Sequence, residues 1–387
     1  MIERGEYAFF PKEEYDQRVQ KASILMDEQN LDALFLLQTE NLLYFTGYIS
    51  FLKSSKHRPV ATILRPGESP VLILPYLQQG DGIAFSHQED IRLWKTDPVG
   101  FYVSTLKDLG LAKKRIGVEI GPDTNLAMAY LDFEKLKDAL TEATWCDCSN
   151  LLFQCRKIKS PREIEYLTRA AELADKGIER AWRALRTGMT ERKIGQLIAS
   201  AYVEGGADET RSLIVRSDPV HSFEDTFLCN KYLTDRLITT GDYINVDTGC
   251  VYRGYHSDMM RSALIGEPDP KISKGYAAAV LVNESVREAV RPGMTIHELD
   301  QVRVKTIEEN GFEAWLPLTG HCIGLSVHEL PRICSGIHEV LEPGMAFSIE
   351  PTIRWSPYVF VVEDVVLVTE KGSETLNKCT RTLFIVE

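Results

Sequence analysis

Four carboxylates lie in segments that otherwise have the composition of buried β-strands. A bare carboxylate in such a setting costs free energy unless it is paired or binds a metal ion. Four that converge would raise one another's pKa values, at about 1.4 kcal/mol per pKa unit, whereas two divalent cations would cancel all four charges. The pattern therefore predicts a site for two metal ions. The segments are YINVDTG with Asp247, VYRGYHSDMM with Asp258, MAFSIEPTI with Glu350 and FVVEDVVLV with Glu363.

An imidazole ligand is expected from GHCIGLSVHELPR, residues 320–332. This segment contains His321 and His328, and Gly320 and Gly324 allow a close approach of the backbone. Several oxygens with one nitrogen suit Mn²⁺, Fe²⁺, Co²⁺ or Zn²⁺ better than a metal that selects thiolates. Two such ions can hold a hydroxide, polarise a carbonyl and stabilise a tetrahedral oxyanion. The residues therefore predict hydrolysis of an amide.

An internal repeat relates the four acids. LRTGMTERKIGQL at 185–197 aligns without gaps with VRPGMTIHELDQV at 290–302, an offset of 105 residues. The same offset relates Asp258 to Glu363, and it places Asp247 at position 352, two residues from Glu350. Each half thus contributes one pair of carboxylates. Two halves about a pseudo-twofold axis would face both pairs into one cleft.

The helices and strands expected around these residues indicate two domains. The length of 387 residues also suggests two domains. Residues 1–155 alternate short strand-like and helix-like segments, as in an α/β domain. Ser160 to Glu163 form a capping box with proline at the first helical position, and apolar residues then recur at three- and four-residue steps. We predict that this long amphipathic helix opens a second domain, residues 156–387.

Charge and composition argue against several classes of partner. Lys+Arg number 44 against 56 Asp+Glu, and the net charge of -12 argues against nucleic acid or an anionic membrane as a partner. The N-terminus lacks a basic start followed by an apolar core, and no apolar run approaches the roughly 20 residues of a membrane span. These features predict a cytoplasmic protein. The eight scattered cysteines do not form a disulfide framework.

The chain resembles the pita-bread metallopeptidases: prolidase, aminopeptidase P, methionine aminopeptidase and their metal-free relative creatinase. NLLYFTGY at 41–48 and CRKIKSPREIEYL at 155–167 are similar to the prolidase and aminopeptidase P branch. The resemblance implies an α+β protein, with a creatinase-like α/β N-terminal domain before a duplicated, pseudo-twofold pita-bread domain. It also implies a homodimer.

The resemblance assigns a role to each ligand position. Asp247 would chelate one metal ion, and Asp258 and Glu363 would bridge both. His321 and Glu350 would complete the shell of the second ion. Glu350 is also the residue that would move a proton between the bridging water and the leaving amine.

Three more residues have substrate roles in the resemblance. His328 would hold the scissile carbonyl or the tetrahedral oxygen. Arg332, which ends the HELPR segment, is similar to an arginine that binds a substrate carboxylate. His221 in SDPVHSFED is similar to an upstream histidine that contacts substrate near the metal ions.

Four positions depart from the family pattern. Met260 replaces a hydroxyl-bearing residue, Thr352 replaces a glycine, and Val361 replaces an arginine near the last glutamate. Cys322 replaces a glycine beside His321, and strand alternation predicts that it packs away from the metal ions. These changes leave all five ligand positions filled.

The main hypothesis is an Xaa-Pro dipeptidase or aminopeptidase, in which a hydroxide between two metal ions attacks the carbonyl before proline. Mn²⁺ is the predicted metal, with Co²⁺, Zn²⁺ or Fe²⁺ as alternatives. A second hypothesis, which Met260 and Val361 motivate, is a small-molecule hydrolase or lyase similar to creatinase, ectoine hydrolase or sulfoniopropionate lyase. A third is a catalytically inactive binding module, which the complete ligand set disfavours.

Overall fold

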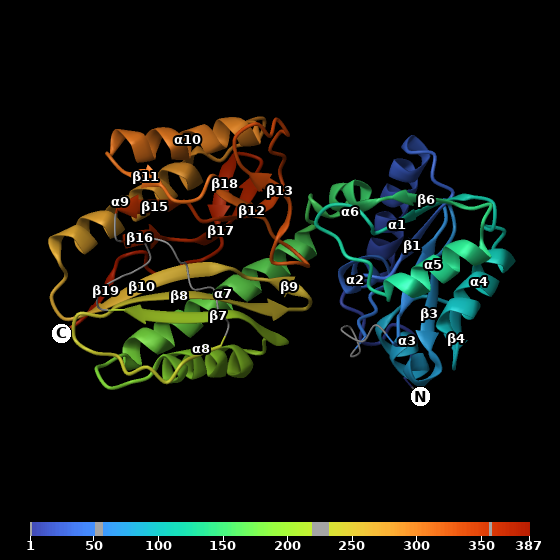
Figure 1. The fold of residues 1–387 in the computed structure, drawn as a ribbon, viewed down its shortest axis with the longest axis horizontal. Helices are drawn as coiled ribbons and strands as arrows, with labels where there is room; N and C mark the ends of the chain where they lie inside the picture. The colour runs from blue at the N-terminus through green and yellow to red at the C-terminus, as the bar shows by residue number, and fades with distance from the viewer. Residues whose placement is uncertain (1, 51–56, 219–231, 356–357) are drawn as a thin grey trace. The chain divides into compact units, whose positions relative to one another are not determined.

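A computed structural model describes residues 2–50, 57–218, 232–355 and 358–387 of the chain (Figure 1). The chain forms two compact units, Met1–Arg156 and Lys157–Glu387. No helix in the described ranges is both long and apolar enough to cross a membrane. Each unit has its own sheets and its own core.

The first unit is a six-stranded sheet covered by helices on both faces. Its strand order is β4-β3-β2-β1-β5-β6, with parallel pairs at β3–β4, β1–β5 and β5–β6 and antiparallel pairs at β1–β2 and β2–β3. Phe35 and Ile73 pack toward α4 and α5, whereas Leu72 and Leu74 pack with Leu42 of α2 on the other face. Strands buried on both faces explain the continuous apolar runs of the sequence.

The elements of this unit, in chain order, are α1 (Lys12–Glu28), β1 (Ala33–Leu36), α2 (Thr39–Thr46), β2 (Ala61–Leu64), β3 (Val71–Pro75), the 3₁₀ turn η1 (Tyr76–Gln78), α3 (Gln79–Phe85), β4 (Ile91–Trp94), α4 (Pro98–Asp108), β5 (Arg115–Val118), α5 (Tyr130–Ala139), β6 (Thr144–Asp147) and α6 (Ser149–Arg156). The predicted α/β character is confirmed.

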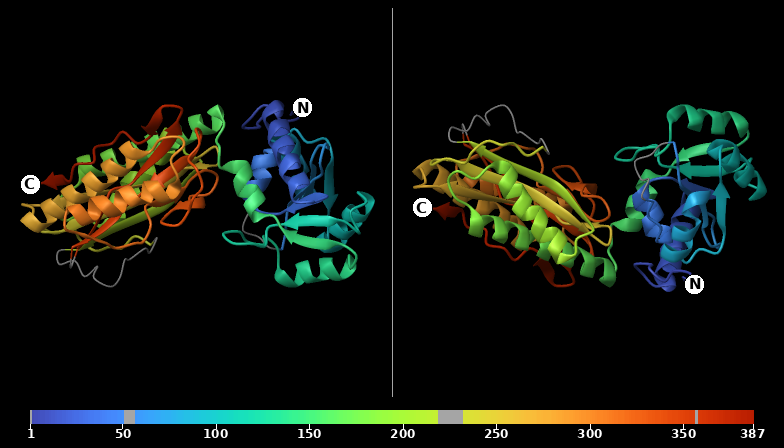
Figure 2. Two further views of the ribbon diagram at one scale, coloured as in Figure 1. Left: turned by 90° about the horizontal axis from the view of Figure 1, so that it is seen from above. Right: turned by 90° about the horizontal axis from the view of Figure 1, so that it is seen from below.

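The second unit contains two halves of similar design. The first half has α7 (Pro161–Ala184), α8 (Glu191–Gly205), β7 (Glu209–Asp218), β8 (Tyr243–Tyr252), β9 (Tyr255–His256) and β10 (Met259–Ile265). The second has α9 (Pro270–Ala289), α10 (Ile296–Glu309), β11 (Glu313–Ala314), β12 (Gly320–Cys322), β13 (Glu329–Ile333), β14 (Ala346–Ile349), β15 (Thr352–Trp355), β16 (Tyr358–Val361), β17 (Asp364–Thr369), β18 (Gly372–Thr375) and β19 (Phe384–Val386). In Figure 2 the helices α9 and α10 cover one side of the sheets, and α7 and α8 cover the other.

Three sheets lie between these helices. One sheet has the order β19-β10-β8-β7, in which the C-terminal strand β19 joins strands of the first half and β9 is added to β8. The second half contributes β13-β12-β14-β17-β18. A smaller sheet has the order β11-β15-β16. Helix α7 begins as predicted, because Ser160 and Glu163 form a reciprocal capping box at its N-terminus.

Equivalent turns in the two halves confirm the internal repeat. Thr190 and Thr295 are the N-caps of α8 and α10, 105 residues apart as predicted. Gly241 and Gly344 occupy a second equivalent turn, with φ of 92° and 90°, and their N–H groups donate to the carbonyls of Ile265 and Val368. This second turn follows an offset of 103, because the second half has two residues fewer between the N-cap threonine and the turn glycine.

That shortening explains the two-residue discrepancy in the repeat. Counting from the turn glycines at 241 and 344, Asp247 and Glu350 hold the same position, although Asp247 lies within β8 and Glu350 directly follows β14. Asp258 and Glu363 are also equivalent, because each directly precedes the next strand, β10 or β17. Each half therefore provides one acid six residues after the turn glycine and one just before the next strand.

Candidate metal centre

The five predicted ligands come together in the second unit. Their ligand atoms form overlapping groups in which all members lie within 4.8 Å of one another. One group joins Asp247, Asp258 and Glu363, and another joins His321, Glu350 and Glu363. Glu363 belongs to both groups, so one carboxylate reaches both parts of the cluster.

Strand alternation places these side chains on one face of their sheets. Val246 and Cys250 pack into the core with α7 and α8, so the intervening Asp247 points to the opposite face. In the second half, Cys322 and Phe347 pack into the core beneath α9 and α10. Their strand neighbours His321 and Ser348 therefore face the site, and Cys322 packs away from it, as predicted.

His321 has the geometry of a neutral metal ligand. Its Nδ1 lies 3.0 Å from the carbonyl oxygen of Cys322, which fixes the ring and leaves Nε2 as the lone-pair nitrogen. Nε2 lies 3.4 Å from Glu350 Oε1 and 3.7 Å from Asp258 Oδ2, and it is buried without a hydrogen-bond partner among the described residues. Burial, with a contribution from His328, lowers the pKa of His321 to about 4.

Two of the four carboxylate residues, Asp258 and Glu363, are buried, and Asp247 and Glu350 are half-buried. Burial raises the pKa of Asp247 to about 7, and burial with the charge of Asp247 raises that of Glu350 to about 8. The pKa values of Asp258 and Glu363 also rise well above their ordinary range, through burial first and then through the neighbouring acids. Among the described residues, no lysine or arginine forms an ion pair with any of the four.

Ser348 is a site residue that the sequence reasoning missed. Its hydroxyl donates a hydrogen bond of 2.7 Å to Glu363 Oε1, and strand pairing places it directly opposite His321. The sequence contained a signal for Ser348: it lies two residues before Glu350, and strand alternation places both side chains on the same face. The donor set of four acids and one orphaned imidazole nitrogen fits two divalent cations.

The predicted substrate residues border this cluster. His328 is exposed, and its ring centroid lies 4.3 Å from that of His321. A nitrogen of His328 also falls within 4.8 Å of ligand atoms of Asp258 and His321. Arg332 is exposed on β13 and pairs in register with His321, so the two share a face. His221 lies outside the described residues.

The comparisons with known proteins agree with this architecture. A family model for metallopeptidase family M24 matches residues 165–370, and a model for the creatinase/prolidase N-terminal domain matches residues 18–158. The first match covers more than half of the chain. The chain belongs to metallopeptidase family M24.

Relatives of this M24 protein are similar over nearly the whole chain. A probable dipeptidase PepE of Mycobacterium tuberculosis is 31% identical over 97% of this chain and 98% of its own length. An Xaa-Pro dipeptidase of Pyrococcus furiosus is 27% identical over 95% of this chain and 99% of its own. The crystal structure of dipeptidase PepE from Mycobacterium ulcerans superposes with a TM-score of 0.83 at 30% identity, covering 97% of this chain and 99% of that one.

These findings establish the protein as a peptidase with a creatinase-type N-terminal domain and a pita-bread C-terminal domain, as predicted. Family membership also implies divalent metal ions. The orphaned Nε2 of His321 and the unbalanced acids fit that implication.

The departures from the family pattern have structural explanations in this M24 peptidase. Met260 is buried and pairs in register with Asp247. Thr352 accepts a hydrogen bond of 3.1 Å from the N–H of Leu316 and pairs across the strand with buried Val361. Met260 and Val361 therefore add apolar surface near the ligands, while Thr352 stabilises a loop.

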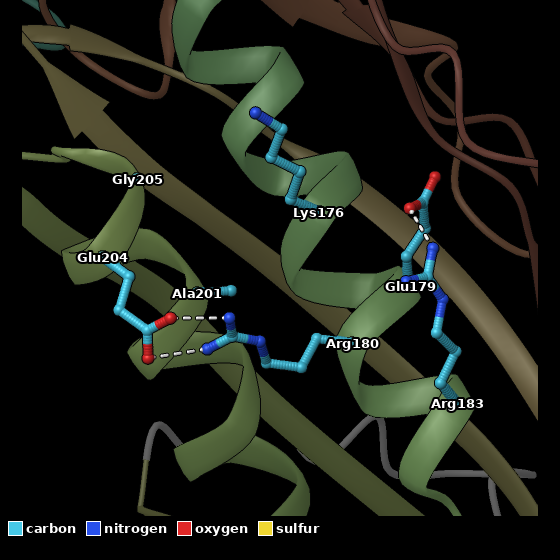
Figure 3. Close-up of a pocket in the computed structure, with 7 residues that line it drawn as sticks. All are labelled: Lys176, Glu179, Arg180, Arg183, Ala201, Glu204 and Gly205. Carbon is cyan, nitrogen blue, oxygen red and sulfur yellow. Dashed lines mark hydrogen bonds and ion pairs between the residues drawn. The ribbon is translucent and has the colours of Figure 1, made fainter.

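A hollow on α7 and α8 lies apart from the metal centre (Figure 3). It has a volume of about 410 Å³ and is lined by Lys176, Glu179, Arg180, Arg183, Ala201, Glu204 and Gly205. Arg180 pairs with both carboxylate oxygens of Glu204, and Arg183 pairs with Glu179. Because these helices cover the sheet face opposite Asp247, the hollow contributes nothing to the chemistry of the cluster.

Proposed function

We propose that this M24 peptidase is an Xaa-Pro dipeptidase or aminopeptidase that uses two divalent metal ions, Mn²⁺ first among them. The observation that supports this most is the cluster of four unbalanced carboxylates, three of which lie within 4.8 Å of His321 with its orphaned Nε2. The relative from Pyrococcus furiosus, which is named an Xaa-Pro dipeptidase, supports the choice of substrate.

The proposed ligand roles follow the two groups of atoms. Asp247 would hold one ion, Asp258 and Glu363 would serve both, and His321 with Glu350 would complete the shell of the second. When bound, two such ions supply Lewis-acid polarisation of a carbonyl and activation of water at neutral pH. Glu350 is also proposed to hold and move a proton between the attacking water and the leaving amine.

The exposed residues beside the cluster bind the peptide in this proposal. His328 contacts the scissile carbonyl oxygen or the oxygen of the tetrahedral state. Arg332 binds the substrate carboxylate with its planar guanidinium, which favours a dipeptide over a longer peptide. His221 is a further proposed contact to substrate.

The test is a comparison of peptides with protein loaded with Mn²⁺ or Co²⁺. We expect cleavage of Xaa-Pro dipeptides, with slower cleavage of the same dipeptides carrying an amidated C-terminus. The Arg332→Gln variant should lose this preference by raising KM for the free acid only. Absence of cleavage across Xaa-Pro dipeptides and longer Xaa-Pro peptides would overturn the substrate assignment.

A small-molecule hydrolase or lyase is the second candidate, favoured by the apolar side chains of Met260 and Val361 close to the ligands. Turnover of a non-peptide amide, amidine or sulfonium compound far above that of any peptide would decide for it.

A cytoplasmic location and a homodimer complete the proposal. The composition supports the location, and the family resemblance supports the dimer. Light scattering of the purified protein tests the dimer.

A further inference from the structure

A buried ion pair involves Glu329, the residue that directly follows His328. Lys159 Nζ lies 3.3 Å from Glu329 Oε2, and the two side chains are 1% and 2% exposed. Glu329 immediately follows His328 and begins β13, while Lys159 immediately precedes Ser160, the N-cap of α7. The pair therefore joins residues 170 positions apart.

The carboxylate of Glu329 organises the backbone between Gly324 and His328. Its Oε1 accepts a hydrogen bond of 3.2 Å from the N–H of Ser326. At Gly324 a side chain is excluded, because a Cβ there would lie 2.8 Å from Glu329 Oε2. The backbone at Gly324 and Ser326 thus packs against this carboxylate. Because Glu329 directly follows His328, the position of the carboxylate affects where the His328 side chain lies.

Lys159 is itself held in place by its surroundings. Its N–H donates a bond of 2.9 Å to the carbonyl of Gly344, the glycine of the second repeated turn. Lys157, two residues earlier, forms ion pairs of 2.7 Å with Glu339 and 3.1 Å with Glu342. The backbone hydrogen bond to Gly344 therefore sets the position of Lys159 itself, whereas the partly exposed pairs of Lys157 do not involve Glu329.

Removing one charge of such a pair leaves the other buried and unbalanced, which is costly, whereas removing both is far better tolerated. Without Lys159, the Glu329 carboxylate would move toward water, and Gly324 to His328 would move with it. We infer that Lys159 is a positioning residue for His328, acting through the Glu329 carboxylate. This inference rests on the role of His328 in the proposed function.

The experiment uses metal-loaded protein with the single variants Lys159→Met and Glu329→Gln and the double variant. Lys157→Met is the matched control, because that lysine is in the same segment and pairs with other acids. For an Xaa-Pro dipeptide, we expect Lys159→Met to lower kcat by ~10–100-fold, with KM and metal content little changed. The double variant and Lys159→Arg should each recover most of that loss, and Lys157→Met should retain the wild-type kcat.

A spectroscopic measurement separates this inference from the proposed function. In protein loaded with diamagnetic Zn²⁺, the ring Cε1–H signal of His328, assigned with His328→Gln, should shift or split in Lys159→Met and return in the double variant. That result supports positioning even if wild-type protein cleaves no Xaa-Pro peptide. A wild-type kcat and an unshifted His328 signal in folded Lys159→Met would overturn the inference. So would a double variant no better than either single one.

Discussion

Glu363 and Asp364 are adjacent acids at the start of β17, and both are buried, yet their surroundings differ completely. Glu363 faces the metal centre, where Ser348 donates to it and no described cation pairs with it. Asp364 faces the other way and forms ion pairs with Arg261 at 2.7 Å and Arg381 at 2.7 Å, with Arg287 at 3.7 Å. One acid is balanced by the protein, and the other is left for a ligand from outside. Charge balance therefore separates the structural acid Asp364 from the proposed metal ligand Glu363, although both are buried.

The strongest test of this contrast is the isosteric change Glu363→Gln. It removes a charge that contacts both groups of ligand atoms, so both metal ions should be lost together, and activity should fall ~1,000-fold or more because several kcal/mol of charge stabilisation disappear. Metal analysis and peptide kinetics check the outcome. Retention of one ion per chain would contradict the bridging role.

The matched change Asp364→Asn should lower stability and leave metal binding unchanged. Arg261 is 1% exposed and would lose its carboxylate partner, so the free energy of unfolding should fall by about 3–5 kcal/mol. Urea denaturation measures this loss, and metal content should stay at the wild-type value. A variant that is stable but free of metal would show that the two acids have similar roles.

The pH dependence of the metal-free protein should separate the two acids further. Because the pKa values of the four site carboxylates are raised on folding, the folded state holds more protons than the unfolded state above pH 6.5. His321 opposes this trend only weakly, since the unfolded imidazole, with its ordinary pKa of 6.5, is half protonated at pH 6.5 and nearly neutral by pH 8, while the folded pKa is about 4. The free energy of unfolding in EDTA should therefore fall between pH 6.5 and 8, by at most ~1.4 kcal/mol per pH unit for each proton.

Glu363→Gln should reduce this slope, and Asp364→Asn should leave it unchanged. Denaturation curves at several pH values in EDTA measure it, and saturating metal should remove the decline by replacing the protons. Stability that rises with pH over this range in EDTA would contradict the raised pKa values.

The smallest expected effect on metal binding comes from removing a serine hydroxyl that donates a hydrogen bond to an acid. Ser348→Ala removes the donor to Glu363 and should weaken metal binding by ~10-fold. Ser335→Ala is the control, because its hydroxyl donates to Asp300, which Arg303 already balances. Titration of both variants with Mn²⁺ makes the comparison, and equal affinities would show that Ser348 does not orient Glu363.

The sequence was sufficient to predict the two-part fold, the internal repeat and the residues that gather at the site. An acid inside an apolar strand is a local signal, and the repeat extends it by a fixed offset. The offset of 105 failed for Asp247 because the second half has two residues fewer before the turn glycine and two more between its acids, which are 13 positions apart against 11 in the first half. The partners of Glu329 and Asp364 were not predictable, since Lys159 and Arg261 lie 170 and 103 positions away and each resembles an ordinary basic residue.

The division of the ligands between the two repeated halves has a consequence for how the protein acquires its metal. Asp247 and Asp258 belong to the first half, and the other three ligands belong to the second. Neither half alone presents a complete ligand set, so tight metal uptake must wait until chain segments about a hundred residues apart have docked. Metal capture during refolding should therefore be a late event, and its time course would report the completion of the second unit.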